Sequence, residues 1–268
     1  MLSHSSDKRR IVGLTDLYKY PGYPSHSGTP ADTENFNLLL RDLREELDAL
    51  GQETGRFYGL TAALPCGPAN IDNINVAEAA KYLTEFNLMS YDFHGAWDDV
   101  TGMNSPLYDR STDKEPGWSV DGCVKNWVAR GAPRERLNIG LGFYGRSFRD
   151  AKALDAPHGG VDDMSWEIDE GSPQYFVSRS LLSLCGHLVD QNSCLLLLCI
   201  FQNIMDQLHS MSVQWDDESK TPYAFFNDRK GGFVSYDDER SICLKTEYAI
   251  NNSLGGFVSL ISFPELSH

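Results

Sequence analysis

The stretch from Gly13 to Gly22, with the sequence GLTDLYKYPG, has the pattern of a β-strand that runs into an aromatic loop closed by a proline. Such strand ends carry the chemistry of many α/β enzymes. Thr15, Leu17 and Lys19 share one face of this segment, because side chains alternate along a strand. A Lys in an apolar site can release its proton near neutral pH, since burial disfavours the charged form. Lys19 is therefore a candidate for proton transfer; the simpler interpretation is a side chain that reaches solvent.

Helices and strands alternate after this loop. Apolar residues recur every three or four positions from 36 to 50, which predicts a helix with Asp32 or Thr33 as its cap and Gly51 as its end. The apolar run 56–65 stops at a proline and predicts a buried parallel strand.

Two further units repeat this order. Their helices are indicated by apolar residues at 76–83 and at 124–128, the second ending near Gly131. The runs 86–93 and 137–145 predict the strands that follow. This alternation predicts βα units around a parallel sheet.

The rhythm breaks between Arg149 and Lys230, where the sequence becomes rich in Gly, Pro and Asp. We therefore predict a barrel-like part over 11–148, an inserted α+β subdomain over 149–230, and a last barrel unit over 231–268. The last unit contains a predicted helix near residues 239–251.

Composition restricts the classes of partner. The chain has 268 residues, 41% hydrophobic residues and a net charge of −15, which suits a protein with a sizeable core. Binding to nucleic acid requires clusters of Lys and Arg, so the acidic balance argues against it and against anionic membrane surfaces. Neutral ligands such as sugars remain open.

Cysteines and apolar runs give further expectations. The six cysteines form no CxxC pair and no Cys/His spacing typical of zinc, so we predict neither a disulfide framework nor a metal site. The longest apolar run, Cys194–Phe201, is far shorter than the roughly 20 residues of a membrane span. The segment MLSHSSDKRR is not followed by an apolar core, so no signal peptide is expected and the compartment stays unassigned.

The segment MSYDFHGAW, Met89–Trp97, resembles the sixth barrel strand of glycoside hydrolase family 18, the chitinases. Further segments match in family order: PGYPSHSGTPADTENF at Pro21–Phe36, SPLY at Ser105–Tyr108, LNIGLGFYGRSF at Leu137–Phe148 and FVSYDDERSI at Phe233–Ile242. The resemblance implies a TIM barrel with an α+β insertion between strands seven and eight.

The resemblance also implies a reaction without a cofactor. Family members cleave β-1,4 bonds between N-acetylglucosamine units, and the acetamido oxygen of the substrate is the nucleophile. One carboxylic acid of the protein protonates the leaving oxygen. A neighbouring Asp orients the acetamide, and a Tyr hydroxyl holds its carbonyl. The implied partners are chitin or N-acetylglucosamine oligosaccharides, and family members are typically extracellular.

The family motif DGxDxDxEYP carries that acid, and it is altered here. Aligned on its YP end, its four carboxylates fall on Val12, Thr15, Leu17 and Lys19. Lys19 occupies the position of the proton donor, and a cation there would repel the positively charged transition state. We therefore predict a chitinase-like protein without hydrolytic activity. Asp16 points to the opposite face and would need a local bulge to replace the acid.

Other family positions are retained. Tyr91 and Asp92 match the MxYD pair that supports catalysis, although a capped strand end would also explain them. Trp97 matches the aromatic platform for the sugar, although a single Trp is often a core residue.

Tyr144 and Arg146 match a YGR motif whose polar tips reach the bound sugar, although Arg146 could instead be an ordinary ion-pair residue. Met89 belongs to the same MxYD motif and counts as a substrate-binding residue, although packing alone would explain it.

Several segments depart from the family. The interval 177–202 interrupts the match, and we interpret it as translated retained intron, with a natural surface insertion as the alternative. Leu260 takes the place of a Trp that floors the acetamide subsite. Nothing before Gly13 resembles the first three strands, which predicts an incomplete TIM (β/α)8 barrel.

The alternatives to an inactive, at most sugar-binding, protein are two. One is an active chitinase whose true N-terminus and splicing restore the motif. The other is a fragment of a misassembled gene that does not fold.

Overall fold

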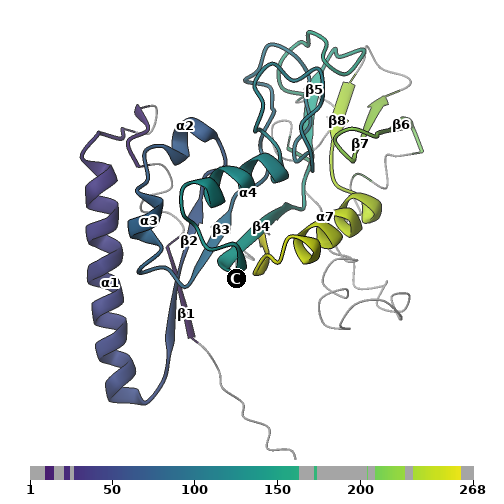
Figure 1. Ribbon diagram of the computed structural model, residues 1–268. Helices are drawn as coiled ribbons and strands as arrows, with labels where there is room; N and C mark the ends of the chain where they lie inside the picture. Colours follow the sequence, from purple (N-terminus) through teal and green to yellow (C-terminus); the bar gives the residue numbers. More distant parts are fainter. Residues whose placement is uncertain are drawn as a thin grey trace, which may run out of the picture. The chain divides into compact units, whose positions relative to one another are not determined.

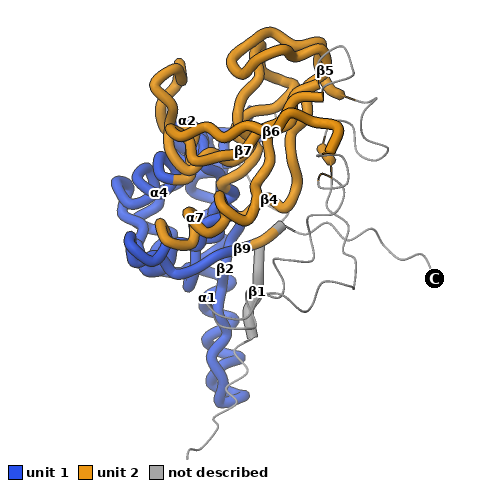
Figure 2. The backbone as a smooth tube through the Cα atoms, turned by 90° about the vertical axis from the view of Figure 1, so that its right-hand side faces the viewer, with its two compact units in different colours: residues 1–89, 121–140, 249–258 blue, residues 90–120, 141–248, 259–268 orange. Residues whose placement is uncertain are grey.

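A computed structural model describes residues 10–14, 21–24, 27–162, 172–173, 204, 209–226 and 232–260. The chain forms two compact units (Figure 2). Unit 1 comprises residues 1–89, 121–140 and 249–258, and unit 2 comprises residues 90–120, 141–248 and 259–268. No helix in the described part of the chain is long and apolar enough to cross a membrane.

A five-stranded sheet has the strand order β1-β2-β3-β4-β9, and most of its residues lie in unit 1. Its first four strands are labelled in Figure 1. Its strands are β1 (Arg10–Leu14), β2 (Tyr58–Leu64), β3 (Glu85–Leu88), β4 (Leu137–Gly142) and β9 (Gly256–Leu260). The pairs β1/β2, β2/β3 and β3/β4 are parallel, as the alternation of helices and strands predicts. The incomplete TIM (β/α)8 barrel stays a prediction.

Strand β2 shows why this sheet is parallel and buried. Tyr58, Leu60, Ala62 and Leu64 are buried on one set of alternate positions, and Gly59 and Thr61 are buried between them. A strand covered on both faces in this way reads as a continuous apolar run instead of an alternating one. The predicted strand over 56–65 is therefore confirmed with slightly shorter bounds.

The helices of unit 1 are α1 (Asp32–Thr54), α2 (Pro68–Ile71), α3 (Val76–Ala79) and most of α4 (Val120–Ala129). Helix α1 packs against β2 and α3 and buries the side chains of Phe36 and Leu40. The predicted end at Gly51 is wrong. The helix continues to Gly55, which has a φ of 65° and donates its N–H to the carbonyl of Gly51. Glycine adopts this left-handed conformation without a steric cost, so Gly55 ends the helix.

The predicted cap of α1 is also wrong. Ala31 precedes the helix and makes no side-chain capping bond. The carboxylate of Asp32, the first helical residue, instead accepts the N–H of Thr29 at 2.7 Å in the preceding turn. Its negative charge still lies in the first turn, where the helix dipole favours it.

A disulfide joins Cys66, just after β2, to Cys123 in α4, with 4.9 Å between the Cα atoms. The expectation of no disulfide framework is corrected here, because the two cysteines are 57 residues apart and only the fold brings them together. Trp127 of α4 reinforces this junction: it is fully buried, and its indole Nε1 donates to the carbonyl of Pro65 at 2.9 Å.

A four-stranded antiparallel sheet lies in unit 2, with the order β5-β8-β7-β6. Its strands are β5 (Arg146–Arg149), β6 (Met211–Asp216), β7 (Thr221–Phe226) and β8 (Gly232–Ser235). Only β6 and β7 lie wholly within the predicted insertion, so the bounds of that subdomain stay a prediction. The interval 177–202 lies outside the described residues.

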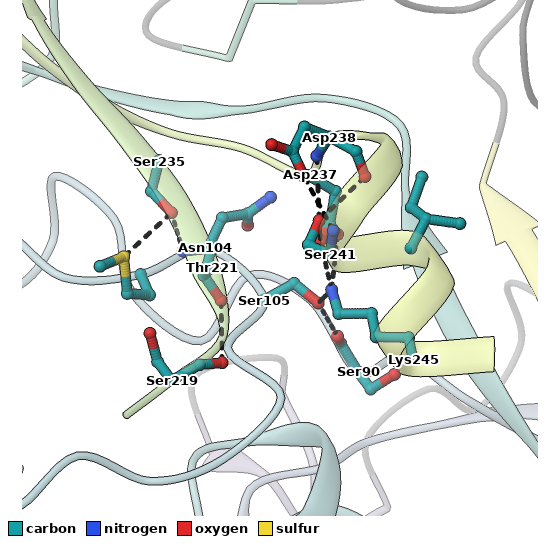
Figure 3. A network of polar contacts seen from close by, with 12 residues as sticks. Ser90, Asn104, Ser105, Ser219, Thr221, Ser235, Asp237, Asp238, Ser241 and Lys245 are labelled. Atoms are coloured by element: carbon teal, nitrogen blue, oxygen red, sulfur yellow. Dashed lines mark hydrogen bonds and ion pairs between the residues drawn. The ribbon is translucent and has the colours of Figure 1, made fainter. Parts of the chain in front are cut away.

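Helix α7 (Glu239–Asn251) has the bounds that the sequence predicts, and it carries a buried ion pair in unit 2. The Lys245 ammonium is 0% exposed and lies 2.6 and 2.7 Å from the two carboxylate oxygens of Asp237 (Figure 3). Ser241 Oγ also donates to Asp237, at 2.7 Å. Burial lowers the pKa of the Lys245 ammonium, and the Asp237 carboxylate opposes that shift.

Loss of the disulfide should destabilise the protein strongly. Closure of a loop of this length restricts the unfolded chain by about 4 kcal/mol in the chain-entropy account. We expect Cys66→Ala/Cys123→Ala to lower the free energy of unfolding in urea by an amount of this order. Cys243→Ala, which removes an exposed thiol of α7, is the control and should leave the transition in place. Superimposable transitions for wild type and the double variant would contradict the assignment.

Removal of one partner of the buried pair should cost more than removal of both. Asp237→Asn leaves the Lys245 charge buried and uncompensated, which we expect to cost about 3–5 kcal/mol of unfolding free energy. The double variant Asp237→Asn/Lys245→Met should regain part of this loss, because it buries no charge. Lys81→Met removes an exposed pair with Glu78 and should have little effect. Equal unfolding midpoints for Asp237→Asn and Lys81→Met would refute this.

Candidate functional site

Five of the predicted site residues lie in unit 2: Tyr91, Asp92, Trp97, Tyr144 and Arg146. The guanidinium of Arg146 contacts three of the others, which are Asp92, Trp97 and Tyr144. Tyr91 and Asp92 follow β3, Tyr144 follows β4, and Arg146 begins β5 of the antiparallel sheet. The segments that follow two parallel strands thus supply these side chains, as is common for α/β enzymes.

The segment Ser90–Phe93 is a turn and not part of a strand. The predicted strand over 86–93 is therefore wrong in its second half, because β3 ends at Leu88. Asp92 has a φ of 60°, in the left-handed region that Asp tolerates better than most residues. Two backbone hydrogen bonds hold the turn: the N–H of Asp92 donates to Asn104 Oδ1, and the N–H of Phe93 donates to the carbonyl of Asn104, both at 3.0 Å.

An ion pair between Arg146 and Asp92 lies at the centre of the site. Arg146 Nε and Nη2 lie 2.7 and 2.6 Å from the same Asp92 oxygen, Oδ1. A third guanidinium nitrogen, Nη1, donates to Ser172 Oγ. The structure shows that Arg146 forms an ion pair, as one of its two interpretations expects. Its partner Asp92 is itself a predicted site residue, so the other interpretation, a contact with the sugar, stays a prediction. Hydrogen bonds between charged groups are roughly twice as strong as neutral ones, which fixes the plane of the guanidinium.

Two aromatic rings lie against that guanidinium. Its central carbon is 5.0 Å from the ring centroid of Trp97 and 5.3 Å from that of Tyr144. Tyr91 in turn packs edge-on against Tyr144, with 5.9 Å between centroids. Cation–π contacts at these distances favour one ring orientation. Trp97 is held in place and yet remains 60% exposed.

Gly95 is required for the position of Trp97. A Cβ atom at residue 95 would lie 2.3 Å from Cη2 of the Trp97 indole. The indole therefore lies directly over its own loop, where a side chain would displace it. The exposed ring presents a flat apolar surface beside charged and hydroxyl groups, which is the arrangement that stacks on the apolar face of a sugar.

The Tyr144 hydroxyl is buried and makes no hydrogen bond of good geometry within the described residues. The residue is 8% exposed, and the Asp92 carboxylate is the neighbouring acceptor. Burial raises the pKa of the Tyr144 phenol well above its ordinary value, and the neighbouring Asp92 carboxylate raises that pKa further. The phenol therefore keeps its proton at neutral pH. A buried hydroxyl costs free energy unless it is hydrogen-bonded, so a ligand oxygen or a water molecule would find a ready donor here.

Met89 lies in unit 1, at the end of β3. Its N–H donates to the carbonyl of Leu64 at 2.8 Å and extends the ladder between β2 and β3. Packing at a strand end explains this residue, and its role in substrate binding stays a prediction.

Most of the acid motif lies outside the described residues. Thr15, Asp16, Leu17 and Lys19 lie outside the described residues, and for Val12 only the backbone pairing with Leu60 is defined. Leu260 ends β9, with no description of its side chain. The predicted loss of the proton donor therefore rests on the sequence alone. In the described residues, no group of three or more His, Cys, Asp or Glu side chains could hold a metal ion.

Sequence reasoning missed Asn104 and Ser105, which lie in unit 2 and are both buried. Ser105 begins the SPLY match, but an Asn-Ser pair in a loop normally indicates no more than a turn. The sequence feature that could have pointed to Asn104 and Ser105 is that these two polar residues lie between the apolar residues Met103 and Leu107, which are also buried.

Comparisons with known proteins agree on one family. The model of glycosyl hydrolases family 18 matches residues 16–259. Endochitinase 1 of Metarhizium robertsii (strain ARSEF 23 / ATCC MYA-3075) is 34% identical over 234 residues, which cover 84% of this chain and 47% of that protein. Chitinase A1 of Niallia circulans is 29% identical over 93% of this chain and 34% of its own length. The chain thus spans less than half the length of these two relatives.

A solved structure gives the same result. An immunomodulatory active chitinase from Trichuris suis superimposes with a TM-score of 0.73 and is 28% identical, over 92% of this chain and 60% of that one. The resemblance that the sequence motifs indicate is therefore confirmed: this chain belongs to glycosyl hydrolases family 18.

Proposed function

We propose that this protein binds oligosaccharides of β-1,4-linked N-acetylglucosamine without hydrolysing them. The site would consist of Trp97, Tyr144, Arg146 and Asp92, with Tyr91 packed behind Tyr144. Family membership and the chitinase names of the relatives support this class of ligand. The net charge of −15 suits a neutral sugar better than an anionic ligand.

One observation carries the proposal: an exposed indole is held next to a buried hydroxyl that makes no hydrogen bond of good geometry within the described residues. Trp97 would stack on the apolar face of one sugar ring. The Tyr144 hydroxyl would donate to a sugar or acetamide oxygen, which gives this buried group a hydrogen bond of good geometry. Arg146 would position both rings, and Asp92 would accept from a sugar N–H or O–H.

The absence of hydrolysis follows from the sequence of the acid motif. Lys19 replaces the carboxyl group of the proton donor, a cation at that position would repel the positively charged transition state, and Leu17 cannot orient the acetamide. General acid catalysis is commonly worth about 10²–10⁴-fold in rate. An active chitinase is the second candidate function, because it is the activity of the family.

Substitution of Trp97 should weaken oligosaccharide binding. We expect Trp97→Ala to raise the Kd for chitohexaose about tenfold, measured by titration calorimetry, because the stacking surface is lost. Phe57→Ala is a matched control: Phe57 is 54% exposed, and the Arg44 guanidinium lies 5.6 Å from its ring centroid. Binding that is absent in wild type, or equal in both variants, would contradict the proposed function.

Hydrolysis should be undetectable. A chromogenic chitobioside incubated with purified protein should release no more product than it does with Tyr91→Phe, a variant that removes one family-matched hydroxyl. Wild-type turnover above that of the variant would show that the chain is an active chitinase. A cooperative thermal transition in both samples is the control for folding, and its absence would favour the fragment alternative.

A further inference from the structure

The segment Ser90–Phe93 of the proposed site contains a residue in an unfavourable backbone conformation, Asp92. Asp92 lies in the left-handed region with a φ of 60°, and such a conformation costs free energy and persists only when its surroundings hold it there. Asp92 is also the ion-pair partner of Arg146, whose guanidinium contacts Trp97 and Tyr144. Whatever holds Ser90–Phe93 in this turn therefore controls the whole site.

We propose that Asn104 and Ser105 are the positioning residues of this site and set its oligosaccharide affinity without contacting the sugar. This inference rests on the proposed function for its effect on affinity. Both residues are almost fully buried, with 1% and 2% exposure, so neither side chain is open to a ligand.

The two residues hold the turn at both of its ends. Ser105 Oγ donates to the carbonyl of Ser90 at 2.7 Å. Asn104 accepts two N–H groups of the turn, each at 3.0 Å. Its side-chain oxygen accepts from Asp92, and its backbone carbonyl accepts from Phe93. A shift of the turn would leave these buried groups unpaired, which is costly.

The Asn104 amide also links the two segments that carry the site. Its Oδ1 accepts from the Asp92 N–H, and its Nδ2 donates to the carbonyl of Tyr144 at 3.0 Å. The donor and the acceptor ends of the amide are both used, so its orientation is defined by its partners. An Asp side chain at this position would keep the acceptor and lose the donor, and an Ala would lose both.

Asn104 and Ser105 are themselves held by hydrogen bonds to buried residues (Figure 3). The N–H of Asn104 donates to Ser235 Oγ at 2.9 Å, and Lys245 Nζ donates to Ser105 Oγ at 2.8 Å. Ser235 ends β8, and Lys245 lies in α7 with its charge balanced by Asp237. The positioning residues are thus tied to the antiparallel sheet and to α7.

Hydrogen–deuterium exchange of the ligand-free protein separates positioning from general stabilisation. Asn104→Ala should speed exchange about tenfold or more in the segments 90–93 and 144–146, and raise the Kd for chitohexaose about tenfold. Asn138→Ala is the matched control, because Asn138 of β4 is also a buried amide and donates to Asn87 Oδ1 at 2.9 Å in unit 1. It should lower the unfolding midpoint and leave both readouts unchanged.

Asn104→Asp gives the sharper result. This variant should speed hydrogen–deuterium exchange in 144–146 and leave exchange in 90–93 slow. If Asn104→Ala does not fold, the exchange data of Asn104→Asp alone test the inference. Wild-type exchange rates in both segments of the tested Asn104 variant would overturn the inference, as would equal effects of Asn138→Ala on these segments. If wild type binds no oligosaccharide, the proposed function fails, and the exchange data still decide whether Asn104 positions the turn.

Discussion

The ion pair between Arg146 and Asp92 is the interaction on which the candidate site depends. Two guanidinium nitrogens lie within 2.7 Å of one carboxylate oxygen, and this fixes the plane of the guanidinium against which Trp97 and Tyr144 pack. The charge of Arg146 thereby orders an exposed aromatic ring that would otherwise have several rotamers. The backbone of Asp92 has a φ of 60° in this arrangement.

The buried polar groups of unit 2 explain how this backbone is maintained. Hydrogen bonds from Ser105 and to Asn104 fix the turn, and the Lys245–Asp237 pair fixes Ser105. A buried ion pair is weak evidence for stability, because the desolvation of two charges offsets their attraction. We interpret its role as one of specificity, because the remaining hydrogen bond of the Lys245 ammonium, to Ser105 Oγ, joins α7 to the loop that contains Ser105.

The sequence predicts the parallel sheet and α7 well, because their apolar residues recur with a clear period. It also identifies Trp97, Tyr144 and Arg146, which the structure places in one cluster, although their roles remain proposals. The errors arise where a tertiary partner overrides a local signal. Gly51 lies inside α1 because Gly55 provides the end of the helix, and Cys66 and Cys123 are paired by packing that no spacing reveals. Asn104 was missed because its importance comes from residues distant in sequence.

The central claim is that the cluster around Arg146 is a binding site for oligosaccharides of N-acetylglucosamine. Titration calorimetry with chitohexaose on Arg146→Ala and Arg149→Ala tests it most directly. Arg149 is the last residue of β5, the strand that Arg146 begins, and its Nε lies 3.7 Å from Asp150 Oδ2. Arg149→Ala therefore controls for the loss of one positive charge. The account predicts saturable binding for wild type and Arg149→Ala, and loss of binding for Arg146→Ala. Equal affinities for the two variants, or no binding by wild type, would contradict it.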